Sequence, residues 1–159
     1  MYIRIAIGAL SLLLLAFAFV YDLASSVVAE KRSFEEQARK WAQERTSITQ
    51  VDEVAEYRGQ QTYTVVIGRN QVGTPLIAWM TPEKVIFDTL DRAVTKESVT
   101  EALQKGYPGA EILQIVPGLA GDRRFWEATL LDQEGKYHYI RYDFYTGQIT
   151  QSYAVRPAN

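Results

Sequence analysis

The stretch FWEATLLDQEGKYHYIRYDFYTGQITQSY, residues 125–153, predicts two antiparallel strands joined by a tight turn. Core-facing residues take alternate positions in each half: Trp126, Ala128 and Leu130 first, then His138, Ile140, Tyr142 and Phe144. The connecting loop, Gln133-Glu134-Gly135, ends in a glycine, which can adopt positive φ. The resulting register pairs Leu130 with His138, Ala128 with Ile140 and Trp126 with Tyr142. Both apolar sets then face one core.

The opposite face of these strands gathers polar and aromatic residues, namely Glu127, Thr129, Tyr137, Tyr139, Arg141, Asp143 and Tyr145. A second turn at Thr146-Gly147 leads into a further strand over residues 148–153. Tyrosine and arginine are enriched where protein interfaces concentrate their binding energy. The candidate residues for a partner-binding surface are therefore Tyr137, Tyr139, Arg141 and Tyr145. The alternative is cross-strand aromatic pairing that supports a sheet with one wet face.

The same pattern occurs earlier in the chain, at a displacement of 63 positions without a gap. This displacement superposes Tyr63, Val65, Ile67, Ile77, Trp79 and Ile86 on Trp126, Ala128, Leu130, Ile140, Tyr142 and Ile149. Strands are expected over residues 47–57, 62–67, 75–80, 85–87 and 111–116. We interpret the two meanders as copies of one unit.

An amphipathic helix is expected before each meander. The first begins at Ser33, which forms a capping box with Glu36, although the absence of proline and glycine over residues 22–31 also allows one uninterrupted helix. The second begins at the N-cap Thr95 and stops at Gly106. The sequence thus predicts an α+β fold in which residues 1–30 precede two modules, 31–93 and 94–159, each a helix packed on an antiparallel sheet.

Residues 5–21, IAIGALSLLLLAFAFVY, contain no charge and are just long enough to span a bilayer as a helix. Arg4 precedes this run and Asp22 follows it, so the N-terminal side is expected to stay cytoplasmic. These features predict an N-terminal transmembrane helix and a single-pass protein of the cell membrane with extracellular C-terminal modules. The alternative is a cleaved signal peptide, with Val27 and Ala29 before a cut at Glu30.

The composition argues against several kinds of chemistry. A formal net charge of −2 gives no broad electrostatic basis for binding nucleic acid. The chain has no cysteine, which excludes disulfides and thiol catalysis, and His138 is its only histidine. No nucleophile elbow or phosphate loop is present. We therefore expect no catalytic, cofactor-binding or metal-binding residues, and no enzyme activity.

Each unit resembles a PepSY-type, cystatin-like module, and the final turn YDFYTGQI, residues 142–149, is of the kind that such modules carry. The whole arrangement, with SFEEQA at residues 33–38 after the apolar run, resembles the TseB-like cell-wall elongation regulators of bacilli. The resemblance implies two tandem cystatin-like modules and a non-catalytic, extracytoplasmic role in peptidoglycan synthesis. It also implies binding to a wall-synthesis protein such as a penicillin-binding transpeptidase.

A second function follows from the same resemblance. PepSY-type units are similar to the inhibitory propeptides of secreted metalloproteases, so a protease-directed inhibitor or chaperone is the alternative. A propeptide is expected to precede a catalytic domain, whereas this chain ends at Asn159, which favours the regulator.

Overall fold

The computed structural model describes residues 2–156, without the side chains of residues 2–13, 23, 24 and 27. It contains α1 (Tyr2–Arg45), β1 (Gln50–Arg58), β2 (Thr62–Arg69), β3 (Pro75–Met80), β4 (Val85–Thr89), α2 (Lys96–Gly106), β5 (Glu111–Ala120), β6 (Arg123–Leu131), β7 (Tyr137–Asp143) and β8 (Ile149–Val155). The chain divides into two compact units, Met1–Gln37 and Ala38–Asn159. All strands and α2 belong to the second unit.

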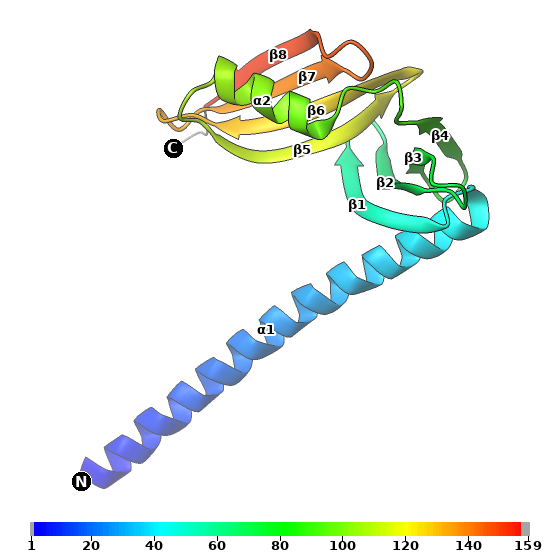
Figure 1. Ribbon diagram of the computed structural model, residues 1–159. Coiled ribbons are helices and arrows are strands. Elements are labelled where there is room, and N and C mark those ends of the chain that lie inside the picture. The colour runs from blue at the N-terminus through cyan, green and yellow to red at the C-terminus, as the bar shows by residue number, and fades with distance from the viewer. Residues whose placement is uncertain (1, 157–159) are drawn as a thin grey trace. The chain divides into compact units, whose positions relative to one another are not determined.

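The strands form two four-stranded antiparallel meanders, which we name sheet A (β1-β2-β3-β4) and sheet B (β5-β6-β7-β8) (Figure 1). The predicted register of sheet B is confirmed, because Leu130 pairs with His138 and Ala128 with Ile140. Within each sheet, neighbouring strands are also consecutive in the chain, because short turns join them.

Two hairpins with the same hydrogen bonds show which residues of sheet A and sheet B occupy equivalent positions. In sheet A the side chain of Asn70 accepts hydrogen bonds from the backbone N–H groups of Val72 and Thr74, at 3.1 and 2.8 Å. In sheet B Asp132, 62 positions later, accepts the corresponding bonds from residues 134 and 136, both at 2.9 Å. The expected displacement of 63 is therefore wrong by one residue at this hairpin. This difference changes which residues of the two sheets correspond, but the residues expected to face the core in sheet A, among them Val65 and Trp79, do lie in the core that contains Trp126.

Sheet A is buried on both of its faces. One face packs against the end of α1 and includes Val66, Ala78 and Met80. The other face, with Val65 and Trp79, belongs to a larger core that also contains Trp126, Phe144 and the buried residues of α2, Val99 and Leu103. Two separate helix-on-sheet modules were expected, and this part of the predicted fold class is wrong because the sheets share one core.

Trp79 joins the two sheets directly. Its ring is fully buried, and its Nε1–H donates a 3.1 Å hydrogen bond to the backbone carbonyl of Pro117 in β5. The ring of Phe144 lies edge-on to it at 5.6 Å. The guanidinium of Arg124 lies over the same ring at 5.9 Å. Trp79 therefore stabilises the contact between the two sheets rather than the packing of sheet A alone.

Two helix ends in the sheet-containing unit are held by specific contacts. Thr95 caps α2, because its hydroxyl accepts a 3.1 Å hydrogen bond from the N–H of Ser98, which confirms the predicted N-cap. At the end of α1, Arg45 donates a 2.7 Å hydrogen bond to the carbonyl of Thr81, next to β3. α1 runs through Ser33 without a break, so the capping box predicted there is wrong and the uninterrupted helix is correct.

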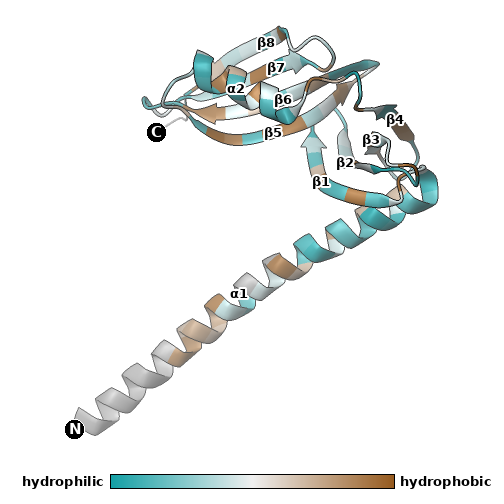
Figure 2. Ribbon diagram, viewed as in Figure 1, coloured by the Kyte–Doolittle hydropathy of each residue, from teal (hydrophilic) through white to brown (hydrophobic). Residues whose placement is uncertain are grey.

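The predicted transmembrane helix requires a correction. In the part of the chain that the structure describes, no helix combines the length and the apolar character that crossing a membrane requires. The side chains of residues 5–13 lie outside that description. From Leu14 onward α1 meets charges at Asp22, Glu30 and Lys31, and Figure 2 shows its hydrophobic colour giving way to hydrophilic residues. This finding overturns the expected span over residues 5–21 and the single-pass location in the cell membrane that followed from it.

We predict that Trp79→Ala lowers the free energy of unfolding by about 3 to 5 kcal/mol, since it truncates a buried aromatic residue and leaves a cavity. Both sheets should unfold in one transition, because Trp79 belongs to their shared core. Urea denaturation followed by near-ultraviolet circular dichroism measures both quantities. Val72→Ala, at a side chain that is 85% exposed, is the control and should change the free energy by less than about 0.5 kcal/mol. Two separate transitions would contradict the shared core.

Candidate functional site

The face of sheet B that carries Glu127 and Arg141 has a cluster of aromatic and charged side chains, of which Tyr57 and Phe125 are also part of the shared core. Successive cross-strand pairs place Glu127 beside Arg141, Arg141 beside Gln151, and Tyr139 beside Tyr153. We define the outer-face cluster as Tyr57, Phe125, Glu127, Tyr139, Arg141, Gln151 and Tyr153. The parity of β6 and β7 predicts that Tyr139 and Arg141 share this face, and the structure confirms it.

Arg141 is the centre of the outer-face cluster. Its Nε donates a 2.7 Å hydrogen bond to Glu127, and its Nη1 donates a 3.1 Å hydrogen bond to the amide oxygen of Gln151. The guanidinium also lies 4.5 Å from the centre of the Phe125 ring. Arg141 and Glu127 are both largely buried, with 26% and 17% of their side chains exposed, so their charges interact at lower dielectric than on an open surface. These contacts fix the guanidinium in one orientation.

Tyr57 brings sheet A into the outer-face cluster. Its hydroxyl accepts a 3.2 Å hydrogen bond from Nη2 of Arg141, 84 positions later in the chain. Its ring packs edge-on against Phe125 at 5.5 Å. Burial raises the pKa of the Tyr57 hydroxyl, the Glu127 carboxylate raises it further, and Arg141 acts in the opposite direction. Tyr57 therefore remains neutral at physiological pH and serves as a hydrogen-bonding partner for the arginine.

A groove opens beside this cluster, between the end of β1 and the face of sheet B. Its volume is about 380 Å³, and it is lined by polar, charged and aromatic side chains together with one valine, namely Glu56, Tyr57, Arg58, Gln114, Val116, Glu127, Thr129 and Tyr139.

 Tyr139 stacks on Tyr153 at the side of this groove, with ring centres 5.1 Å apart and planes 14° from parallel. The groove therefore offers aromatic edges and hydrogen-bonding groups to a protein surface.

The other two predicted surface residues have different surroundings. Tyr137 lies at the start of β7, half-buried and paired with Val155 of β8. Tyr145 lies in the turn after β7, where its hydroxyl donates a hydrogen bond to Asp88 and its ring packs edge-on against Phe144. Tyr145 thus contacts residues outside the outer-face cluster, because the alternation of a strand does not continue through a turn.

Asp88 and Arg124 form an ion pair beside Tyr145. Nε of Arg124 lies 3.0 Å from a carboxylate oxygen of Asp88, but this N–H is not aligned for a hydrogen bond. The contact links β4 of sheet A with β6 of sheet B, so it supports the junction between the sheets.

His138 has a structural environment. Its Nε2 lies 2.7 Å from a carboxylate oxygen of Asp132, and its ring packs against Tyr107 at 5.2 Å. Within the described residues, no group of three or more His, Cys, Asp and Glu side chains is arranged to hold a metal ion. The contacts of His138 account for its position at the hairpin.

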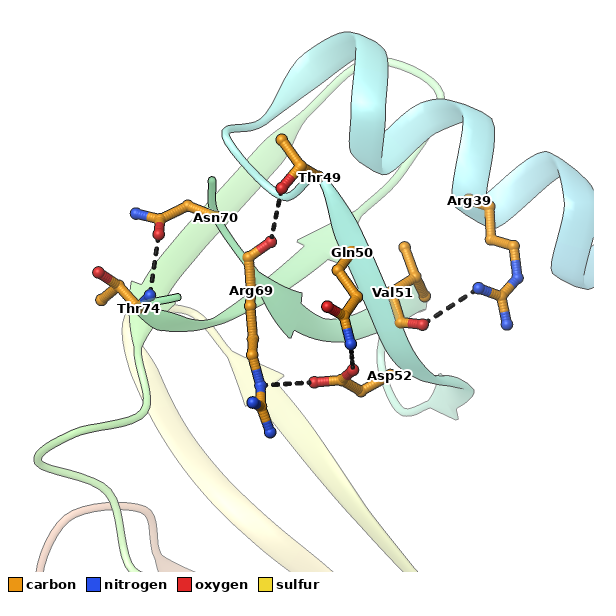
Figure 3. A network of polar contacts seen from close by, with 8 residues as sticks. All are labelled: Arg39, Thr49, Gln50, Val51, Asp52, Arg69, Asn70 and Thr74. Atoms are coloured by element: carbon orange, nitrogen blue, oxygen red, sulfur yellow. Dashed lines mark hydrogen bonds and ion pairs between the residues drawn. The ribbon is translucent and has the colours of Figure 1, made fainter. Parts of the chain in front are cut away.

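A cleft of about 420 Å³ lies where sheet A meets the start of α2, and its rim carries charged side chains. Arg69 pairs with Asp52 at 3.2 Å, and Lys96 pairs with Glu53 at 2.6 Å. Figure 3 shows the first pair within a network that also contains Arg39, whose guanidinium donates a 3.1 Å hydrogen bond to the carbonyl of residue 51. These rim charges bind one another and no tyrosine is among the described residues that line the cleft, whereas the outer-face cluster carries the stacked Tyr139 and Tyr153, so we place the candidate site on that cluster.

Sequence reasoning missed four members of the outer-face cluster. Tyr57 comes from β1, and no local pattern connects it with β7. Gln151 and Tyr153 alternate along β8, so their shared face could have been found from the parity of that strand. Phe125 also follows the parity of β6, on the face that carries Glu127.

Comparisons with known proteins agree with the resemblance seen in the sequence. The family model described as "Cell wall elongation regulator TseB-like domain" matches residues 37–81, which include the end of α1 and β1 to β3. A protein of Bacillus subtilis (strain 168) named "Probable cell wall elongation regulator TseB" is 27% identical over 142 residues, covering 87% of this chain and 86% of that protein. A solved structure titled "YpmB protein from Bacillus subtilis" has a TM-score of 0.63 and 26% identity, covering 77% of this chain and 96% of that one. These findings confirm the predicted resemblance to the TseB-like family.

The turn after β7 provides a pH-dependent prediction. Asp143 accepts hydrogen bonds from the backbone N–H groups of Tyr145 and Thr146 and from the Thr146 hydroxyl. These bonds hold the pKa of the Asp143 carboxyl below its ordinary value of 3.8, the backbone bond from Thr146 contributing most. A lowered folded-state pKa contributes stability that is present above the unfolded value and is lost as the pH falls through the folded value.

We therefore expect Asp143→Asn to be less stable than the parent at pH 7, with a difference that shrinks below pH 3.8. Urea denaturation at pH 7 and at about pH 3 measures this difference. Asp122→Asn, at an exposed carboxylate in the β5–β6 turn, is the control. A difference that stays constant over this range would contradict the role assigned to the Asp143 carboxylate.

Proposed function

Because a TseB-like cell wall elongation regulator domain spans residues 37–81 of this chain, we propose that the protein regulates cell-wall elongation. The name of the B. subtilis relative supports this role over most of the chain. We further propose that the protein acts without catalysis, by binding another protein. The partner in this proposal is a cell-wall synthesis protein such as a penicillin-binding transpeptidase.

One observation carries the choice of binding surface: the outer-face cluster presents tyrosines around a fixed arginine beside a groove. Tyrosine supplies a large contact area with few rotatable bonds, and arginine is enriched among residues that dominate binding energy. Arg141 is already bound to Glu127 and Tyr57, so its part is to hold the cluster in place. The residues that meet the partner are then Tyr139 of the outer-face cluster and Tyr137, which lies outside the cluster but on the same side of β7, with Tyr145 outside the proposed contact.

The test is the affinity of the parent and a double variant for purified elongation-class transpeptidases of the source organism. Tyr137→Ser with Tyr139→Ser should weaken binding by about 2 kcal/mol or more, which is roughly 30-fold. Biolayer interferometry measures the affinity, and imaging of cells that carry the variant measures elongation. Phe87→Ser in β4, at an aromatic residue that is 61% exposed, is the matched control and should bind as the parent does.

The possible outcomes distinguish an error in the proposed binding surface from an error in the proposed partner. A double variant that melts like the parent but binds less tightly supports the proposed surface. A double variant that binds and supports elongation like the parent contradicts it. If the parent itself binds none of these transpeptidases, the proposed partner is wrong.

A further inference from the structure

The four edge strands of the two sheets differ in how they are protected against pairing with another strand. β1 carries four charged residues and a bulge between Val51 and Glu53. β4 has only five residues, one of them Asp88. β5 contains Pro117, has a bulge between Ile112 and Gln114, and lies against β1. Charges, bulges, prolines and short strands are the devices by which sheets avoid edge-to-edge association.

β8 has little of this protection. Its sequence, ITQSYAV, contains no charge and no proline, and all seven residues are exposed. A bulge interrupts its pairing near its start, which leaves Gln151 to Val155 in regular register with β7. Its outward backbone groups are therefore available to another extended strand. Tyr153 and Val155 are 45% and 48% exposed on the same side of it.

We propose that β8 pairs antiparallel with β8 of a second copy of this chain, with Tyr153 on the two-fold axis. In this register Gln151 lies opposite Val155 of the second copy, and Ser152 lies opposite its Ala154. This arrangement pairs all five regular residues of each strand. It also joins the two B sheets into one eight-stranded sheet.

A second copy suits this edge for two reasons. The strand has no charge, so two copies bring no like charges together across the axis. Tyr139 and Tyr153 already stack within one copy, and the two-fold axis extends them into a row of four tyrosines. A contact of one strand per chain buries less area than a stable dimer needs, so the dimer is weak and depends on concentration.

The first test uses opposite charges at the axis in the full-length chain. Tyr153→Lys and Tyr153→Glu each place like charges opposite one another, so each should weaken dimerisation at least about 10-fold relative to the parent. An equimolar mixture of the two variants should dimerise again. Sedimentation equilibrium up to about 1 mM protein measures all three samples, and thermal melts verify that each variant is folded. Val72→Lys, at an exposed apolar residue in the β2–β3 turn, is the control and should associate as the parent does.

The second test uses the absence of native cysteine. Mixing Ser152→Cys protein with Ala154→Cys protein should give a mixed disulfide-linked dimer faster than either protein gives one alone, because the proposed register sets these two positions opposite each other. A parent that remains monomeric at 1 mM overturns the proposal and leaves β8 to a strand from another protein. Single Tyr153 variants that associate like the parent, or a mixture that fails to recover, also overturn it.

Discussion

Sheet A is buried on both faces, and the rest of the sheet-containing unit depends on this constraint. Val66 and Ala78 face the end of α1, whereas Val65 and Trp79 face the core shared with sheet B. Exposing either face would uncover a large apolar area, and each Å² of it would cost about 25 cal/mol of free energy. The two halves of the unit therefore stabilise each other.

The same constraint explains why the two sheets differ in what they present to solvent. In sheet B the residue at the position equivalent to Ala78 is Ile140, which lies in the core with the buried residues of α2, and the neighbouring Tyr139 and Arg141 lie on the opposite face. The corresponding side of sheet A is buried around Trp79. The two sheets thus have equivalent strands but different surfaces, because the end of α1 and the shared core cover both faces of sheet A.

Much of this fold could be predicted from the sequence, and the errors have physical causes. The hairpin of sheet B alternates apolar and polar residues, so its register was correct to the residue. In β3 every residue from Leu76 to Met80 is buried, so the alternation that distinguishes two faces is absent. The displacement between the repeats could have been fixed by the turns, since Asn70 with Gly73 matches Asp132 with Gly135.

The candidate site was predictable only in part. Tyr139 and Arg141 follow strand parity, but Tyr145 sits in a turn where parity ends. Tyr57 reaches the cluster through tertiary packing between the sheets, which no local pattern encodes. The apolar run over residues 5–21 was read as a span from its length and lack of charge, and the described part of α1 does not support that interpretation.

The hydrogen bonds of Arg141 also have an entropic consequence. A free arginine side chain loses about 2 kcal/mol of rotamer entropy when a partner immobilises it. In this protein Glu127, Gln151 and Tyr57 have already restricted those rotamers on folding. A surface organised before the encounter loses little further freedom on association, so contacts formed there contribute more of their energy to affinity.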